Sequence, residues 1–163
     1  MQRGLAPDIS IEQYGRVEQA LKVAEHYDLL VLDGAPHATR ATEQIAGASD
    51  LVILPTGLAL DDLQPGVQLA HELAKHVEQR RLVFALCRVG DSAREIAEAR
   101  DYLQAAGYAV LSGELPEKTA YHQASDQGRA VTETRYATLN KRAEALAQSI
   151  VDRITQMGSE KGT

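Results

Sequence analysis

Short, wholly apolar runs alternate along the chain with segments whose apolar residues recur at helical spacing. The runs occupy residues 29–32, 51–54, 82–86 and 108–111. Because each run is apolar on both sides, we expect strands that are covered by helices on both faces of a sheet. Strands that alternate with helices pair in parallel. The pattern therefore predicts an α/β fold of three layers, with a mostly parallel sheet of about four strands between helices.

Capping patterns mark two of the expected helix starts. Ser10 is followed three residues later by Gln13, and Ser92 by Glu95, which is the spacing of a capping box. We therefore expect one helix to begin at Ser10, ahead of the first strand. A second helix is expected to begin at Ser92, between the third and fourth strands.

The composition is that of an ordinary globular protein, and it argues against disulfide-stabilised, membrane and broad nucleic-acid-binding classes. The chain has 163 residues, of which 44% are hydrophobic, and we expect one domain over residues 1–157 and a disordered polar tail over 158–163. Cys87 is the single cysteine and cannot form an internal disulfide. The sequence shows neither an apolar signal peptide nor a membrane-spanning run, so we expect a cytoplasmic protein without a membrane partner. The net charge of -6 argues against broad nucleic-acid binding.

Glycine, proline and polar residues follow each expected strand. Ligands of open parallel sheets bind at the carboxyl ends of the strands, so these positions form the candidate site. The alternative is that Gly and Pro serve turn geometry alone. Asp33 is the exception, because a carboxylate followed by a stiff turn suits a hydrated Mg²⁺. Asp61 and Asp62 are interpreted as acidic residues that stabilise a helix start, with a contact to the site as the alternative.

The order of these features resembles the middle and second half of the ParA/MinD-type partition ATPases. The matching pieces are residues 28–36, which contain the family's Asp-x-x-Pro strand end, residues 48–55, and a Pro-containing loop followed by residues 124–128. The resemblance covers residues 15–155. It implies an incomplete P-loop NTPase-like fold, ATP and Mg²⁺ as cofactors, and a role in partition of plasmid or chromosomal DNA.

The resemblance places one part of the site around the phosphates. It implies that Asp33 holds Mg²⁺ through a bound water and that Pro36 stiffens the switch segment. It also implies that Pro55 ends a strand beside the phosphates. The sequence suggests no catalytic residue.

A second part of the site is implied around the base. Leu115, Pro116 and Glu117 match the loop that flanks the purine in the family. Cys87, followed by Arg88, stands where many relatives carry an adenine-reading Asn. A thiol is a poor substitute for a carboxamide, because it lacks the paired donor and acceptor that read a base edge.

The phosphate-binding loop of the family is missing from the sequence. No Gly-x-x-x-x-Gly-Lys-[Ser/Thr] stretch occurs. Because backbone N–H groups and a helix N-terminus must offset the triphosphate charge, we expect no ATP hydrolysis by this chain alone. The family's P-loop strand lies between the strands matched by residues 29–32 and 51–54. Without it, we expect these two strands either to pair directly or to keep unpaired edges that recruit another chain.

Two interpretations follow, with different partners. The first is a truncated ParA-like domain, which implies a homodimer or a full-length ParA-like ATPase and a partition adaptor protein as partners. The alternative is a non-catalytic module that docks onto a full-length ATPase or a partition partner. Nonspecific DNA is a further partner that the resemblance implies, although acidic residues interleave the basic residues Arg129, Arg135, Lys141, Arg142 and Arg153. A synthetase of the same superfamily has no pocket motif to support it.

Overall fold

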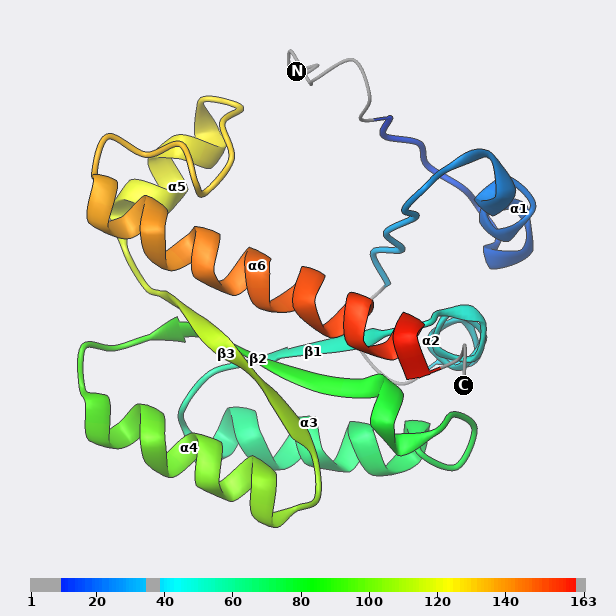
Figure 1. Ribbon diagram of the computed structural model, residues 1–163, viewed down its shortest axis with the longest axis horizontal. Coiled ribbons are helices and arrows are strands. Elements are labelled where there is room, and N and C mark those ends of the chain that lie inside the picture. Colours follow the sequence, from blue (N-terminus) through cyan, green and yellow to red (C-terminus); the bar gives the residue numbers. More distant parts are fainter. Residues whose placement is uncertain (1–9, 35–38, 161–163) are drawn as a thin grey trace.

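A parallel sheet of three strands lies at the centre of the computed structural model, which describes residues 10–34 and 39–160 (Figure 1). The strands β1 (Val52–Thr56), β2 (Leu82–Val89) and β3 (Ala109–Pro116) lie in that order. β1 pairs with β2 from Val52 opposite Leu82 to Thr56 opposite Leu86, and β2 pairs in parallel with β3. The α/β class and the last three expected strands are thus confirmed.

Helices cover both faces of the sheet. α3 and α4 lie together on one face and α6 crosses the other face, as Figure 1 shows. This is the expected arrangement of a parallel sheet between layers of helices. The helices are α1 (Val17–Leu21), η1 (Ala24–His26), α2 (Arg40–Ala48), α3 (Leu60–Leu73), η2 (Gln79–Arg81), α4 (Ala93–Ala105), α5 (Thr119–Asp126) and α6 (Ala137–Glu160).

The amino-terminal part departs from the prediction. Residues 29–32 are irregular rather than a strand, and the helix that was expected to begin at Ser10 begins only at Val17. A strand needs a neighbouring strand to bond its backbone. No backbone hydrogen bond joins residues 28–34 to any other residue that the structure describes. The prediction of a fourth strand over residues 29–32 is therefore wrong, and direct pairing with β1 does not occur.

The start of α4 and the end of α6 can be compared with the helix boundaries that the sequence predicts. The Glu95 N–H donates a 3.3 Å hydrogen bond to Ser92 Oγ, so Ser92 caps α4 as its sequence pattern predicts. At the carboxyl end, α6 continues to Glu160, past the boundary expected after Met157. Residues 161–163 of the expected tail lie outside the described residues.

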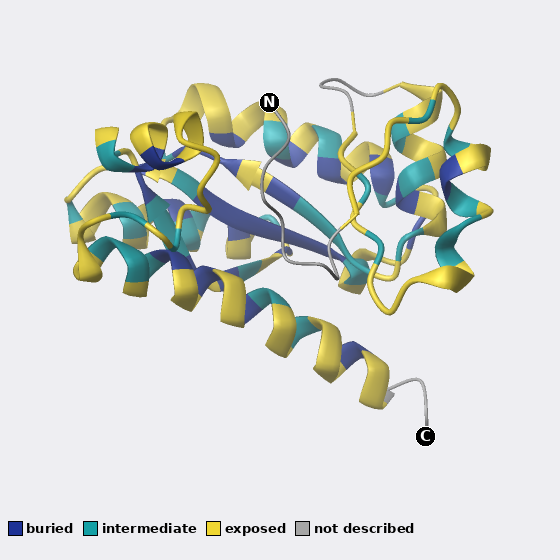
Figure 2. Ribbon diagram, turned by 90° about the horizontal axis from the view of Figure 1, so that it is seen from above, coloured by how far each residue is buried: buried dark blue, intermediate teal, exposed yellow. Residues whose placement is uncertain are grey.

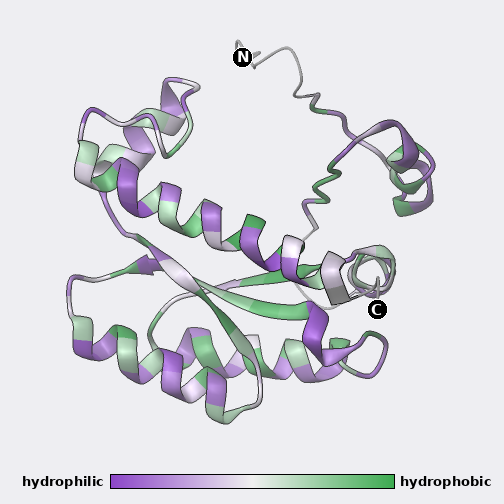
Figure 3. Ribbon diagram, viewed as in Figure 1, coloured by the Kyte–Doolittle hydropathy of each residue, from purple (hydrophilic) through white to green (hydrophobic). Residues whose placement is uncertain are grey.

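The larger core lies between the sheet and the layer of α3 and α4. Phe84 and Leu86 of β2 are fully buried there, in one cluster with Leu73 of α3 and Leu103 of α4. Figure 2 shows the buried strands at the centre, and Figure 3 shows the apolar strands between helices whose polar residues face outward. Burial of each of these four large apolar side chains contributes about 1.5–3 kcal/mol before the loss of conformational entropy is counted.

A smaller core lies beneath α6. Successive side chains of a strand point to opposite faces, so Val83 and Ala85 of β2 face α6, where they cluster with Leu111 and Leu146. At Gly113 the backbone of β3 approaches α6 closely. A Cβ there would lie 2.6 Å from the Cα and N of Leu146. Only glycine allows this distance between strand and helix.

Candidate functional site

The ends of β2 and β3 bring together five of the residues that the sequence singles out. Cys87 of β2 lies opposite Leu115 of β3, and Val89 lies opposite Pro116. The Glu117 N–H then donates a 3.0 Å hydrogen bond to the Val89 C=O, which ties the two strand ends together. Arg88 lies between the two paired positions. Because the strands are parallel, all of these positions lie at the carboxyl edge of the sheet.

Arg88 is an extra residue in β2 and has an unusual backbone conformation. The register advances by two residues in β2 and by one in β3 between these pairs, so Arg88 forms a β-bulge. Its φ is 55°, in the left-handed region that non-glycine residues rarely occupy. The bulge turns its side chain outward, where it is 69% exposed. The structure therefore presents a guanidinium at the carboxyl edge of the sheet.

Asp62 is the partner of Arg88. It lies in the first turn of α3, and its Oδ1 is 3.7 Å from the Arg88 guanidinium. The Asp62 carboxylate also lies against Gly57, the buried residue that follows β1, at a place where a side chain on Gly57 would clash. The first turn of α3 thus gives an acidic neighbour to the strand ends. The place of Asp62 in the first turn of α3 is the one expected of an acidic residue that stabilises a helix start.

Cys87 is a poor nucleophile at neutral pH. The residue is partly buried, and this burial raises the pKa of its thiol, while the nearby charge of Arg88 opposes the shift. A thiol with a raised pKa stays protonated at pH 7 and reacts slowly. Cys87 therefore contributes size and weak polarity to the edge rather than nucleophilic chemistry.

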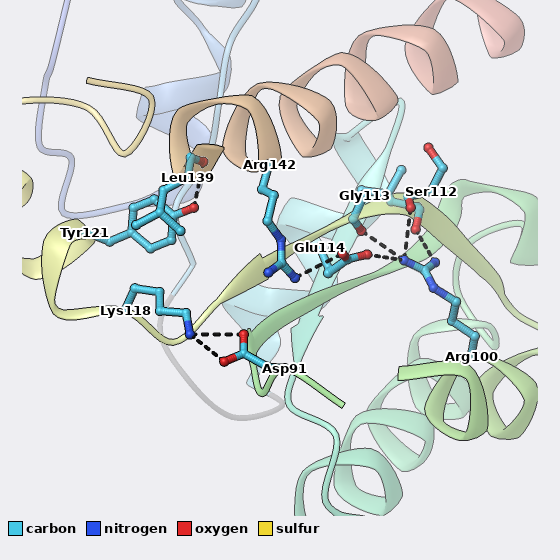
Figure 4. Close-up of polar contacts among 10 residues, drawn as sticks. Asp91, Arg100, Ser112, Gly113, Glu114, Lys118, Tyr121, Leu139 and Arg142 are labelled. Atoms are coloured by element: carbon cyan, nitrogen blue, oxygen red, sulfur yellow. Dashed lines mark hydrogen bonds and ion pairs between the residues drawn. The ribbon is translucent and has the colours of Figure 1, made fainter. Parts of the chain in front are cut away.

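An ion pair and a hydrogen bond lie at this edge, next to α5. Lys118 Nζ lies 3.0 and 2.8 Å from the two carboxylate oxygens of Asp91, and this bond lowers the pKa of Asp91 (Figure 4). His122 Nε2 lies 2.7 Å from Glu117 Oε1. Sequence reasoning did not single out Lys118 or His122. Their position just after β3 was the available signal.

A more buried cluster supports β3 behind the edge. Glu114 accepts a 3.0 Å bond from Arg100 of α4 on one carboxylate oxygen and a 3.1 Å bond from Arg142 of α6 on the other (Figure 4). Arg100 also donates to the C=O groups of Leu111, Ser112 and Gly113. These carbonyls belong to the segment where β3 bulges against β2, since the register passes from Phe84 opposite Val110 to Leu86 opposite Glu114. The cluster therefore supplies hydrogen-bond donors to the carbonyl groups of this bulge, and its role is structural.

The residues expected around the phosphates, unlike those at the ends of β2 and β3, are not brought together among the described residues. Asp33 is exposed in an irregular segment rather than at the end of a strand, and Pro36 lies outside the described residues. Pro55 lies within β1, opposite Ala85, and does not end the strand, which continues to Thr56. An exposed proline in an edge strand is tolerated because its missing N–H can face away from the sheet.

These positions do not fit a complete site for ATP and Mg²⁺. Asp33 offers one exposed carboxylate, and Mg²⁺ takes its other oxygen ligands from water and from the phosphates of a nucleotide, for which the sequence contains no Gly-Lys phosphate-binding loop. Over residues 10–34 and 39–160, no group of three or more His, Cys, Asp or Glu side chains is placed to hold a metal ion.

None of the helices in the described ranges is long and apolar enough to cross a membrane. Comparison with known proteins matches the chain to no family model and to no curated protein. The chemistry of the strand ends is therefore what bears on function.

Proposed function

We propose that the chain is the carboxyl-terminal part of a ParA/MinD-like ATPase domain, from the family that partitions plasmid or chromosomal DNA. The observation that carries this proposal is the edge formed by β2 and β3. It gathers Cys87, Arg88, Leu115, Pro116 and Glu117, the positions at which the resemblance puts the purine of ATP. Three consecutive parallel strands with helices on both faces are compatible with a P-loop NTPase-like fold.

In this proposal the chain does not hydrolyse ATP alone. The sequence lacks a Gly-Lys phosphate-binding loop. Asp33 by itself cannot offset the charge of a triphosphate, which requires several oriented N–H donors. A second polypeptide segment with such a loop would have to contribute the phosphate-binding half.

The test is co-expression of the chain with an amino-terminal fragment of a ParA-family ATPase that carries the loop. We expect the two to co-purify and to bind a fluorescent ATP analogue with Mg²⁺. Asp33→Asn should weaken binding by about tenfold or more, equivalent to about 1.4 kcal/mol. Asp101→Asn, at an exposed position of α4, is the matched control and should leave binding unchanged.

Two results would contradict this proposal. One is failure of the two polypeptides to co-purify. The other is Mg²⁺-dependent ATP hydrolysis by the chain alone that disappears in Asp33→Asn, since the chain would then contain a complete site.

The second candidate function is a non-catalytic docking module. The observation in its favour is the set of large apolar side chains that remain exposed on the amino-terminal segment and on α6, namely Leu29, Val31, Val151 and Ile154. Large apolar side chains that remain exposed are often covered when a partner binds. Capture of a full-length ParA-like ATPase by the immobilised chain, without nucleotide, would support this function over the first.

A further inference from the structure

Two parts of the chain that suit strand pairing lack a partner strand among the described residues. β1 pairs only with β2 there, so its outer edge bonds no other strand. Residues 29–32, here called the apolar segment, make no backbone hydrogen bond to any described residue. Unpaired strand edges with apolar side chains readily bind further strands.

The apolar segment already shows the two-residue alternation of a strand. Leu29 and Val31 are 64% and 78% exposed, whereas Leu30 and Leu32 between and after them are partly buried. Alternate residues of a strand point to opposite sides. One side of the segment therefore rests on the molecule while an equally apolar side faces outward.

The apolar segment ends next to the helix that leads into β1. A side chain at Gly34 would lie 3.7 Å from Ile45 of α2. α2 ends at Ala48, and β1 begins at Val52. Figure 1 shows the segment passing between α1 and the layer of α6 before it reaches α2. The segment and the open strand edge thus belong to the same end of the molecule.

We infer that the β1 edge and the apolar segment together accept an apolar β-strand flanked by Lys or Arg from another protein. Backbone bonds to β1 would supply the pairing, as in β-strand addition, and the apolar segment would cover the added strand. The charge of the flanks follows from Asp28 and Asp33, which bracket the apolar segment in a chain of net charge -6. This inference rests on the docking function and requires no nucleotide.

A second copy of the chain suits this surface poorly. If two apolar segments paired antiparallel about their centre, Asp28 of one copy would lie opposite Asp33 of the other. Like charges directly opposite each other destabilise a strand pair. Pro55 has no N–H to donate, so any strand added to β1 can pair only with the residues before it, 52–54. Charge complementarity therefore favours a basic partner strand.

The test uses the full chain and a fluorescein-labelled peptide, Lys-Lys-Val-Ile-Val-Ile-Val-Lys-Lys. We expect saturable binding by fluorescence anisotropy and slower amide hydrogen exchange at residues 30–32 and 52–54. The same peptide with Pro at its centre, or with Glu in place of Lys, should bind at least about tenfold more weakly, which corresponds to about 1.4 kcal/mol.

Variants of the protein sharpen this test. Val31→Lys should weaken peptide binding, whereas Val131→Lys, at another exposed valine, should not. The double variant Asp28→Lys/Asp33→Lys should reverse the preference toward the peptide with Glu flanks. Far-ultraviolet circular dichroism checks that each variant is folded.

Three results would overturn the inference: no binding of the basic peptide, binding that Val31→Lys leaves unchanged, or a concentration-dependent dimer that protects the same amides. If the peptide binds but a full-length ParA-like ATPase is not captured, the strand site stands and the docking partner is wrong. If the ATPase is captured but the peptide fails, docking stands and the strand site is wrong.

Discussion

The two faces of the sheet are closed to different degrees. On the face of α3 and α4, Leu82, Phe84 and Leu86 of β2 have exposures of 0%. On the face of α6, Val83 and Ala85 of β2 are buried as well, at 1% and 4%. The faces differ at the edge strand β1, where Leu54 is 8% exposed on the α3 and α4 face and Ile53 is only partly buried on the α6 face. α6 itself exposes Val151 (53%) and Ile154 (38%), although they belong to the helix that covers this face.

This difference in burial follows from the number of helices that pack on each face of the sheet. The crossovers from β1 to β2 and from β2 to β3 place α3 and α4 on the same face. Within residues 10–34 and 39–160, α6 is the one helix that crosses the other face, and it packs mainly on β3. A helix is about 10–12 Å wide with its side chains. Three strands at a spacing of about 4.8 Å are about 14 Å wide. One helix therefore leaves the β1 side of its face open.

The largest expected effect comes from removing a leucine from each face. Leu86→Ala should lower the free energy of unfolding by about 3–5 kcal/mol, because the closed layer cannot relax around the cavity. Leu111→Ala, on the α6 face, should cost about 2–3 kcal/mol, since a single covering helix can shift. Urea unfolding followed by circular dichroism measures both. An equal or larger loss for Leu111→Ala would break the comparison of the faces.

The contact between β3 and α6 is tested next. Gly113→Ala should cost about 2–3 kcal/mol, because its Cβ would meet the backbone of Leu146 and push the helix from the sheet. Gly90→Ala is the control, since a Cβ there meets nothing within 4 Å, and should change stability by less than about 0.5 kcal/mol. A similar loss of the free energy of unfolding in the two variants would show that α6 packs weakly against β3.

The bulge in β3 gives a smaller effect. Arg100→Met should lower the free energy of unfolding by about 1–3 kcal/mol, because the C=O groups of Leu111 and Gly113 would lose their donor. Arg94→Met removes a surface ion pair on the same helix, at a side chain that is 87% exposed, and should stay within about 0.5 kcal/mol. Thermal unfolding compares the two. If Arg100→Met lowered the free energy of unfolding no more than Arg94→Met does, the Arg100 and Glu114 cluster would not stabilise β3.

The smallest effect is an alkaline pH dependence that involves both faces. Burial raises the pKa of Tyr108 beside Phe84 and of Tyr121, whose hydroxyl donates to the Leu139 C=O near the start of α6. A raised pKa in the folded state means that this stabilisation is complete below the unfolded pKa of about 10 and is lost as pH rises through the folded pKa. Urea unfolding from pH 8 to 11 should show stability falling above about pH 10. Tyr108→Phe should flatten part of this fall, and an unchanged slope would contradict the assignment.

Much of the central fold could be predicted from the sequence because its signals are local. The wholly apolar runs that become β2 and β3 are typical of strands covered on both faces, and the pattern at Ser92 and Glu95 places the start of α4. The association of Cys87 and Arg88 with the segment from Leu115 to Glu117 also follows from sequence order, since parallel strands bring their carboxyl ends to one edge.

Other features were decided only by the tertiary structure, because they depend on neighbours that no local pattern specifies. The apolar run at residues 29–32 has the composition of a strand, but no described strand lies beside it to bond its backbone. The left-handed Arg88 arises from a mismatch of one residue between β2 and β3. Composition thus determined which segments can form strands, whereas pairing determined which of them do, because a strand is stable only when its backbone groups find partners.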